Sequence, residues 1–240
     1  MTRVFRSTAP ARLRLLAFDL DGTLIDSVAD LCASVNAMLR HFGLPQLPNS
    51  VIATYIGDGV AALVGRAIGG AESAPAPEEA IEFFLNYYRE HKLDRTYVYS
   101  GVFEALRALR QAPGGGQLAM AVLTNKPMHP SRAICDALGL TPFFFRIYGG
   151  NSFPTKKPDP EGLLTLMREA GAEPEETVMI GDSGVDILTA RAAGAWSIGC
   201  AYGLAPHTLE AARPDCMADS PAAWLEALGL LCPPLLCPDP

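Results

Sequence analysis

Beyond residue 99, short apolar segments alternate with segments of helical periodicity, and this alternation limits the fold more than any other feature of the sequence. Apolar residues that recur at helical spacing predict helices, and compact apolar runs predict buried strands. Strands that alternate with helices form parallel sheets covered by helices on both faces. We therefore predict an α/β fold with a doubly wound, mainly parallel sheet, built from helices at 102–110, 130–138, 161–170 and 185–193 and strands at 118–124, 144–148, 177–180 and 195–200.

The N-terminal part of the chain has a different pattern. One strand is predicted at 13–20 and is followed by helices at 28–42, 58–68 and 77–91. No strand is predicted between about 24 and 99. The α/β core is therefore interrupted after its first strand. We divide the chain into a flexible leader at 1–12, a core at 13–27 and 98–229, a small all-helical insert at 28–97, and a tail rich in proline and cysteine at 230–240.

The composition excludes several classes of function. A net charge of −7 offers no basic surface for nucleic acid. No apolar run is long enough to span a bilayer, and residues 1–14 lack the apolar segment of a secretory signal. The six cysteines include no Cys-x-x-Cys pair, so we expect reduced thiols and a cytoplasmic protein. The oligomeric state stays open between a monomer and a homodimer. An acidic protein still binds an anionic substrate where a metal ion and a few cations reverse the local charge.

The run AFDLDGTLIDS at 17–27 carries the strongest chemical signal, because it places Asp19 and Asp21 at the end of the first predicted strand. Side chains two positions apart on a strand point to one face, so we expect these carboxylates to converge. Buried like charges at that distance raise one pKa unless a cation or a substrate charge lies between them. Gly22 permits a sharp exit from the strand, and Thr23 adds a hydroxyl. The alternative is that one aspartate is solvated and the other caps a turn.

Polar residues also end the second core strand and precede a later helix, and open parallel sheets bind ligands at the carboxyl ends of their strands. Thr124 and Asn125 can donate hydrogen bonds to a phosphoryl oxygen, or they cap the next helix. Lys157 precedes a rigid Pro-Asp-Pro turn that restricts its backbone, so we favour it over Lys156 as a charge aimed into the site.

A third strand end, GDSGVD at 181–186, places Asp182 and Asp186 on either side of a turn into a helix. Oxygen-rich carboxylates on loops are the ligands that a hard cation such as Mg²⁺ requires. Asp182 alone could be a helix N-cap, whereas Asp186 lies one turn further on. Together these residues indicate a cation site at the same edge of the sheet.

In this order, DLDGT at 19–23, LTN at 123–125, KPDP at 157–160 and GDSGVD at 181–186 resemble the motifs of the haloacid dehalogenase-like phosphatases. The resemblance covers roughly residues 13 to 228. It implies the Rossmann-like core of that superfamily, and the insert resembles its small cap domain. It also implies a Mg²⁺-dependent phosphomonoesterase that acts through an aspartyl-phosphate.

The resemblance implies a role for each acid. Asp19 is the nucleophile, and Asp21 protonates the leaving alkoxide and then accepts a proton from water. Mg²⁺ is held by Asp19, the backbone carbonyl of Asp21 and Asp182, with Asp186 in support. A second acid, Asp21, together with the Mg²⁺ ligands favours phosphate esters over carbon–halogen bonds.

The resemblance also implies that Thr124, Asn125 and Lys157 neutralise and orient the phosphoryl group. Two positions depart from the pattern of the family. Ser100 stands where proline is frequent, which we expect to alter only a hinge, with hinges near 26–28 and 99–101. Asn151 stands where an acid is frequent, which we expect to weaken support for the metal.

Segments 22–27 and 55–67 resemble phosphatases of the phosphoglycolate type, so 2-phosphoglycolate is the predicted substrate. In the insert, a turn with flexible backbone at Gly57, Asp58 and Gly59 can direct backbone N–H groups at a ligand, and Arg66 can receive a small carboxylate. The alternatives are that the turn only starts a helix and that Arg66 is solvated.

Other functions stay open from the sequence. The substrate could be N-acetylmuramate 6-phosphate or a sugar phosphate, or the enzyme could be a sugar phosphomutase. A protein of a different class, which keeps the fold only to bind a ligand, would have little use for Asp19, Asp21, Lys157, Asp182 and Asp186 together. Release of inorganic phosphate separates the enzyme from the binding protein.

Overall fold

A computed structural model of the chain describes residues 3–4, 10–69, 74–112 and 118–230. Most of the predicted leader, and all of the predicted tail except Leu230, lie outside these residues. Among the described residues, no helix is both long enough and apolar enough to cross a membrane.

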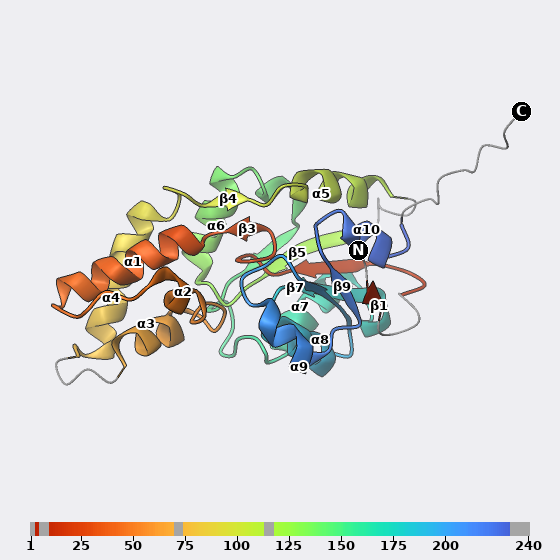
Figure 1. Ribbon diagram of the computed structural model, residues 1–240. Helices are drawn as coiled ribbons and strands as arrows, with labels where there is room; N and C mark the ends of the chain where they lie inside the picture. The colour runs from red at the N-terminus through yellow and green to blue at the C-terminus, as the bar shows by residue number, and fades with distance from the viewer. Residues whose placement is uncertain (1–2, 5–9, 70–73, 113–117, 231–240) are drawn as a thin grey trace, which may run out of the picture.

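The centre of the molecule is a seven-stranded sheet in the order β1-β9-β8-β7-β2-β5-β6 (Figure 1). Six of these strands run parallel, and only β1 pairs antiparallel, with β9, which confirms the predicted mainly parallel sheet. Neither the edge strand β1 nor its neighbour β9 was predicted from the sequence, and β1 lies inside the predicted leader. The strands are β1 (Arg3–Val4), β2 (Leu15–Phe18), β5 (Ala119–Leu123), β6 (Arg146–Tyr148), β7 (Thr177–Gly181), β8 (Trp196–Cys200) and β9 (Cys216–Ala218).

Helices cover both faces of the sheet, as predicted for a doubly wound fold (Figure 1). Leu16 and Phe18 of β2 face one layer, and Leu15 and Ala17 face the other, because alternate residues of a strand point to opposite faces. All four residues are fully buried, so the strand is a continuous apolar run. The first layer contains α5 (Val102–Gln111), α6 (Met128–Ala137) and α10 (Ala223–Ala227), and the second contains α7 (Glu161–Ala170) and α8 (Gly184–Ala192), against which α9 (Leu209–Ala212) packs.

The predicted helical insert is present and lies at one end of the sheet, on the left of Figure 1. Its helices pack on one another through buried side chains such as Val35, Leu63 and Phe84. One predicted helix, at 58–68, starts only at Val60, because Gly59 has a φ of 88°, outside the helical region. The insert consists of α1 (Val28–His41), α2 (Asn49–Ala53), α3 (Val60–Ile68) and α4 (Pro77–His91), and short 3₁₀ turns occur in the core at Thr141–Phe143, Pro174–Glu176 and Pro206–Thr208.

Two short strands, β3 (Ile25–Asp26) and β4 (Tyr97–Val98), connect the insert to the core as an antiparallel pair (Figure 1). The prediction of no strand between about 24 and 99 is therefore wrong. A two-residue strand has no measurable periodicity, so this pair left no signal in the sequence. The pairing joins the two connections at the point where the chain leaves the core and returns to it.

Packing around Phe18 is expected to carry a large share of the core stability. Its ring lies 5.9 Å from that of Phe144 and 5.3 Å from that of Trp224, between centroids. Phe18→Ala should lower the free energy of unfolding by about 3–5 kcal/mol, because the cavity cannot collapse fully. Urea denaturation of this variant and of the control Phe145→Ala, whose side chain is 38 % exposed, measures the difference. Equal losses for the two variants would contradict this assignment of the core.

Candidate active site

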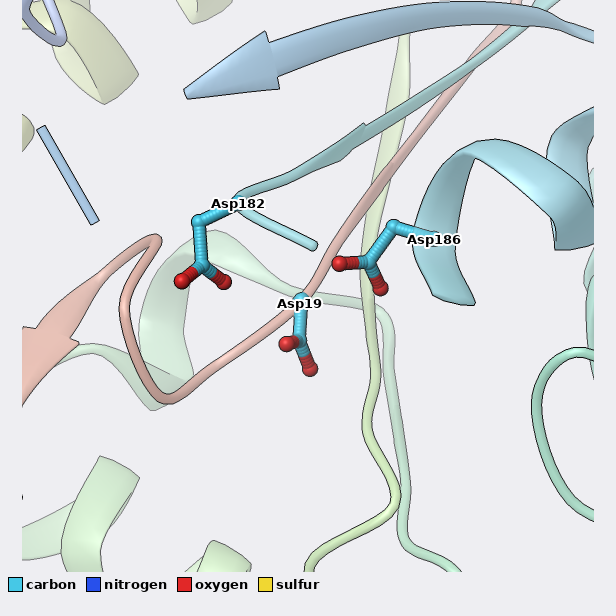
Figure 2. A group of neighbouring side chains, drawn as sticks. All are labelled: Asp19, Asp182 and Asp186. Carbon is cyan, nitrogen blue, oxygen red and sulfur yellow. The ribbon is translucent and has the colours of Figure 1, made fainter. Parts of the chain in front are cut away.

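Three buried aspartates from separate elements gather at the carboxyl ends of β2 and β7 (Figure 2). Asp19 follows β2, Asp182 follows β7, and Asp186 lies in the first turn of α8. Each contributes a carboxylate oxygen, and these oxygens lie within 4.8 Å of one another. The register explains the approach, because Phe18 pairs with Ile180 across the two strands. The residues that follow these strands therefore emerge side by side.

Glycines bring the backbone against these carboxylates. Gly22 has a φ of 88°, and a Cβ at this position would lie 2.2 Å from Asp182 Oδ2. A Cβ at Gly203 would lie 2.2 Å from Asp182 Cβ and 2.4 Å from the carbonyl oxygen of Gly22. No larger residue fits either position without moving Asp182 or the backbone. The sharp exit predicted at Gly22 thus also makes room for the acidic group.

Hydrogen bonds hold Asp182 and Asp186 in place. Asp182 Oδ2 accepts from the backbone N–H groups of Leu204 (2.7 Å) and Ala205 (3.1 Å). Asp186 Oδ2 accepts from the backbone N–H (3.1 Å) and the hydroxyl (2.7 Å) of Ser183, which completes a capping box at the start of α8. Ser183, and not Asp182, is therefore the N-cap of this helix. The carboxylate of Asp182 is left facing the acidic group.

A buried lysine, Lys157, neutralises part of the charge of this group. Its Nζ lies 2.9 Å from Asp19 Oδ1 and donates a hydrogen bond to Asp186 Oδ1 at 2.5 Å. Its side chain is 3 % exposed. The amide of Asn125 donates to the carbonyl oxygen of Lys157 at 3.0 Å and anchors its backbone. The choice of Lys157 over the exposed Lys156 agrees with this placement.

The remaining negative charge makes the group suitable for a metal ion. Burial raises the pKa of Asp182 to about 8, and repulsion from Asp186 and Asp19 adds to the effect. Burial also raises the pKa of Asp19 to about 6, although Lys157 opposes the shift. Three carboxylates facing one ammonium leave an excess of negative charge, which a hard divalent cation with oxygen ligands would balance. Asp19, Asp182 and Asp186 are the residues that can hold it.

Asp21 belongs to a different charged pair. Its carboxylate oxygens accept hydrogen bonds from Lys126 Nζ at 2.9 and 3.0 Å, and Ser27 Oγ donates to its Oδ1 at 2.5 Å. Asp19 and Asp21 do not lie along one strand as predicted, because β2 ends at Phe18. The two acids still line the same cavity. Each is paired with its own lysine.

Sequence reasoning gave Lys126 no role. The one signal in the sequence is its position, because it directly follows Asn125 in the polar segment at the end of a predicted strand. Its side chain is 5 % exposed, and its Nζ lies 4.8 Å from the ring centroid of Tyr88, on α4 of the insert. A lysine buried to this degree requires a partner, and Asp21 supplies it.

Thr124 and Asn125 are buried and line the cavity, as predicted. Neither caps α6, since the backbone N–H of Met128 at its start donates to Asn151 Oδ1 at 2.8 Å. The alternative role of Thr124 and Asn125 as caps is therefore not observed. The side chain of Asn151 thus contacts the start of α6, and its expected effect on metal support stays a prediction.

The glycine turn of the insert contacts the core through carbonyl oxygens, whereas the sequence analysis expected its N–H groups to face a ligand. The carbonyl of Gly57 accepts from Asn125 Nδ2 at 3.1 Å, and that of Asp58 accepts from Lys156 Nζ at 2.5 Å. Gly57 and Gly59 have φ values of 120° and 88° and line the cavity. These contacts hold the insert against the sheet edge.

Arg66 is not brought to the acidic group. Its guanidinium pairs with Asp58 Oδ2 at 2.5 Å and donates to the carbonyl of Tyr55 at 3.2 Å. Asp58 and Tyr55 therefore occupy the guanidinium that was predicted to receive a substrate carboxylate. Arg66 lines a neighbouring cleft between the insert and α8, where Val185 and Leu188 lie.

A cavity of about 50 Å³ lies between the core and the insert, and side chains from both line it. Its core side is polar and its insert side is apolar, so a charged group is expected at the sheet edge and a small neutral segment below the insert. The core contributes Asp19, Asp21, Thr124, Asn125, Lys126 and Asp182, and the insert contributes Leu31, Ile56, Val60, Leu63, Phe84, Leu85 and Tyr88.

Comparison with known proteins gives consistent matches. A family model described as haloacid dehalogenase-like hydrolase matches residues 16–200. The phosphoglycolate phosphatase of Chromobacterium violaceum is 42 % identical over 197 residues, which cover 80 % of this chain and 87 % of the relative. The phosphoglycolate phosphatase of Pseudomonas putida is 39 % identical, over 99 % of this chain and 84 % of the relative. The crystal structure of a predicted phosphoglycolate phosphatase from Haemophilus somnus 129pt superposes with a TM-score of 0.82 at 32 % identity, over 90 % of this chain and 97 % of that one.

The acidic group should bind one divalent cation, which calorimetric titration with Mn²⁺ measures directly. Asp182→Asn removes one carboxylate and is expected to weaken binding by at least about tenfold, because a charged ligand is lost. Asp94→Asn is the matched control, since that carboxylate lies in the insert and is 57 % exposed. Equal affinities for the wild type and Asp182→Asn would refute the assignment of this site.

Proposed function

The chain belongs to the haloacid dehalogenase-like hydrolase family, and we propose that it is a Mg²⁺-dependent phosphatase that hydrolyses 2-phosphoglycolate to glycolate and phosphate. The observation that carries this proposal is the placement of Asp19. It is a buried carboxylate that lies beside Lys157, within the acidic group and at the polar side of the cavity. A nucleophilic carboxylate needs such a cationic surrounding to approach an anionic phosphate ester.

In the first step, a carboxylate oxygen of Asp19 attacks the phosphorus atom, and the bond between phosphorus and the ester oxygen breaks. Asp21 gives its proton to the departing alkoxide, which leaves as the alcohol. In the second step, water attacks the phosphorus atom of the aspartyl-phosphate, and Asp21 takes a proton from that water. The bond to Asp19 breaks, inorganic phosphate leaves, and both aspartates return to their starting states.

The other residues of the site bind and orient the phosphoryl group. Thr124 and Asn125 line the cavity at its expected position, and Lys157 lies beside them against Asp19. In phosphoryl transfer, positioning and electrostatic stabilisation supply most of the catalysis. When bound by Asp19, Asp182 and the backbone carbonyl of Asp21, with Asp186 in support, Mg²⁺ would offset the negative charge of the phosphoryl group.

The insert, 28–97, is proposed to act as a cap that excludes water during transfer and opens for release. Contacts from Asn125 to Gly57 and from Lys156 to Asp58 support this, because they hold the insert on the core over the cavity. The hinges are proposed at 26–28 and 99–101, next to the pair β3 and β4. A cytoplasmic location is part of the proposal, supported by the free, buried thiols of Cys32, Cys135, Cys200 and Cys216.

Two observations support 2-phosphoglycolate as the substrate. The relatives described above carry the name phosphoglycolate phosphatase. The cavity of about 50 Å³ is small, which favours a leaving group as small as glycolate over a sugar.

Asp19→Asn is expected to abolish phosphate release from p-nitrophenyl phosphate, because the amide cannot act as the nucleophile. Chelation of divalent cations should abolish the activity of the wild type as well, and added Mg²⁺ should restore it. A colorimetric phosphate assay measures both effects, with Asp94→Asn as the matched control. Full Mg²⁺-dependent activity in Asp19→Asn would show that another residue is the nucleophile.

A panel of phosphorylated metabolites tests the substrate. We expect the highest kcat/KM for 2-phosphoglycolate, with sugar phosphates lower by at least about tenfold because a small cavity favours a small leaving group. A sugar phosphate or N-acetylmuramate 6-phosphate with the higher kcat/KM would replace 2-phosphoglycolate as the substrate and leave the phosphatase assignment intact.

A further inference from the structure

Lys126 and Asp21 form a buried charged pair at the active-site cavity, and the mechanism above gives Lys126 no role. Lys126 contacts both carboxylate oxygens of Asp21, while Ser27 contacts one of them. Burial disfavours the charged ammonium, but Asp21 and Tyr88 outweigh burial and raise the pKa of Lys126 above its ordinary value. Lys126 is therefore a permanent cation, and its position is fixed by Asp21.

These contacts determine how the carboxyl group of Asp21 is turned. Asp21 lies in the loop after β2, where the backbone alone leaves its side chain free to rotate. Lys126 comes from the end of β5 and Ser27 from the start of α1, so two donors on separate elements restrict that rotation. Charge-assisted hydrogen bonds are short and strongly oriented. Asp21 both gives and takes a proton in the proposed reaction, and either transfer needs its carboxyl group within hydrogen-bond distance of the reacting oxygen, so its orientation is part of its function.

The cap reaches this pair through one aromatic side chain. The ring of Tyr88 lies 4.8 Å from Lys126 Nζ, which is a cation–π distance. Tyr88 is 2 % exposed and stacks on Phe84 of the same helix at 5.7 Å between centroids. Its hydroxyl meets no partner at hydrogen-bond geometry among the described residues, and the face of its ring is its contact with the ammonium of Lys126. The ammonium of Lys126 thus lies between an acid of the core and an aromatic ring of the cap.

We propose that Lys126 is a positioning residue that holds Asp21 in the orientation needed for proton transfer, and that Tyr88 ties this orientation to the seating of the cap. This inference rests on the proposed function, since it concerns the role of Asp21 in that reaction. It assigns Lys126 no contact with the substrate. A receptor for the substrate carboxylate is the competing role, and the experiment separates the two.

The experiment is a double-mutant cycle of Lys126→Met and Asp21→Asn, assayed on 2-phosphoglycolate and on 2-hydroxyethyl phosphate, which has a similar size and no carboxylate. Lys126→Met should lower kcat on both substrates by about 10²-fold, the usual contribution of a general acid. KM should change by less than about threefold, because ground-state binding is unaffected. In the Asp21→Asn background, Lys126→Met should change kcat by less than about twofold, since it acts only through Asp21.

The leaving group provides a readout that a structural role would not move. The p-nitrophenolate ion leaves without a proton, so Lys126→Met should keep the rapid first release of p-nitrophenolate and slow only the later turnover. Lys92→Met, in the insert and outside the cavity, controls for the loss of a lysine. Tyr88→Leu should lower kcat more than Tyr88→Phe does, because phenylalanine keeps the ring. If Lys126→Met fails to fold, Lys126→Gln takes its place in the cycle.

Three results would overturn the inference while leaving the proposed function in place. One is a loss confined to 2-phosphoglycolate and seen in KM, which would make Lys126 the receptor for the carboxylate. The second is an additive loss in the Asp21→Asn background, and the third is an unchanged kcat. A wild-type protein that releases phosphate from none of these esters would instead overturn the proposed function, and the inference with it.

Discussion

The ammonium of Lys157 lies between Asp19 and Asp186, and this contact makes the rest of the site possible. Three carboxylates that approach within 4.8 Å in a buried place repel one another strongly. One lysine lowers that repulsion without removing it, and the excess negative charge defines a place for a divalent cation. The parallel register of β2 and β7 brings the aspartates together. The glycines that pack against Asp182 leave room for its side chain in this crowded place.

The site contains two lysine–aspartate pairs, and we propose that each pair serves a different part of the chemistry. Lys157 and Asp19 lie in the core, where bond making to phosphorus is proposed. Lys126 and Asp21 lie where the core meets the cap, with Tyr88 over the lysine. This division gives a physical reason for two acids so close in sequence to act differently, because each has its own cation and its own surroundings.

The sequence predicted the central part of this arrangement well. Parallel strands end at one edge of a sheet, so Asp19, Thr124 and Asp182 could be placed together from their positions after apolar runs. Lys157 was separable from Lys156 because the following proline restricts its backbone. Such predictions succeed where a residue's position depends on the strand or turn beside it.

The sequence could not predict contacts that depend on how the insert sits on the core. The buried position of Lys126 could not be predicted, because it depends on a contact with Tyr88, which is 38 positions earlier in the chain. Arg66 looked available for a ligand, but Asp58 and Tyr55 occupy it in the folded insert. Strand β9 and the pair β3 and β4 are too short to show a periodic pattern in the sequence.

The proposed nucleophile can be identified directly by trapping the phosphorylated protein. The wild type would be mixed rapidly with phosphoryl-labelled p-nitrophenyl phosphate and Mg²⁺, quenched in acid and digested, and the labelled peptide would be sequenced. We predict label on Asp19, formed as fast as p-nitrophenolate is released. Label on another residue, or phosphate release with no labelled protein at any time, would contradict the account.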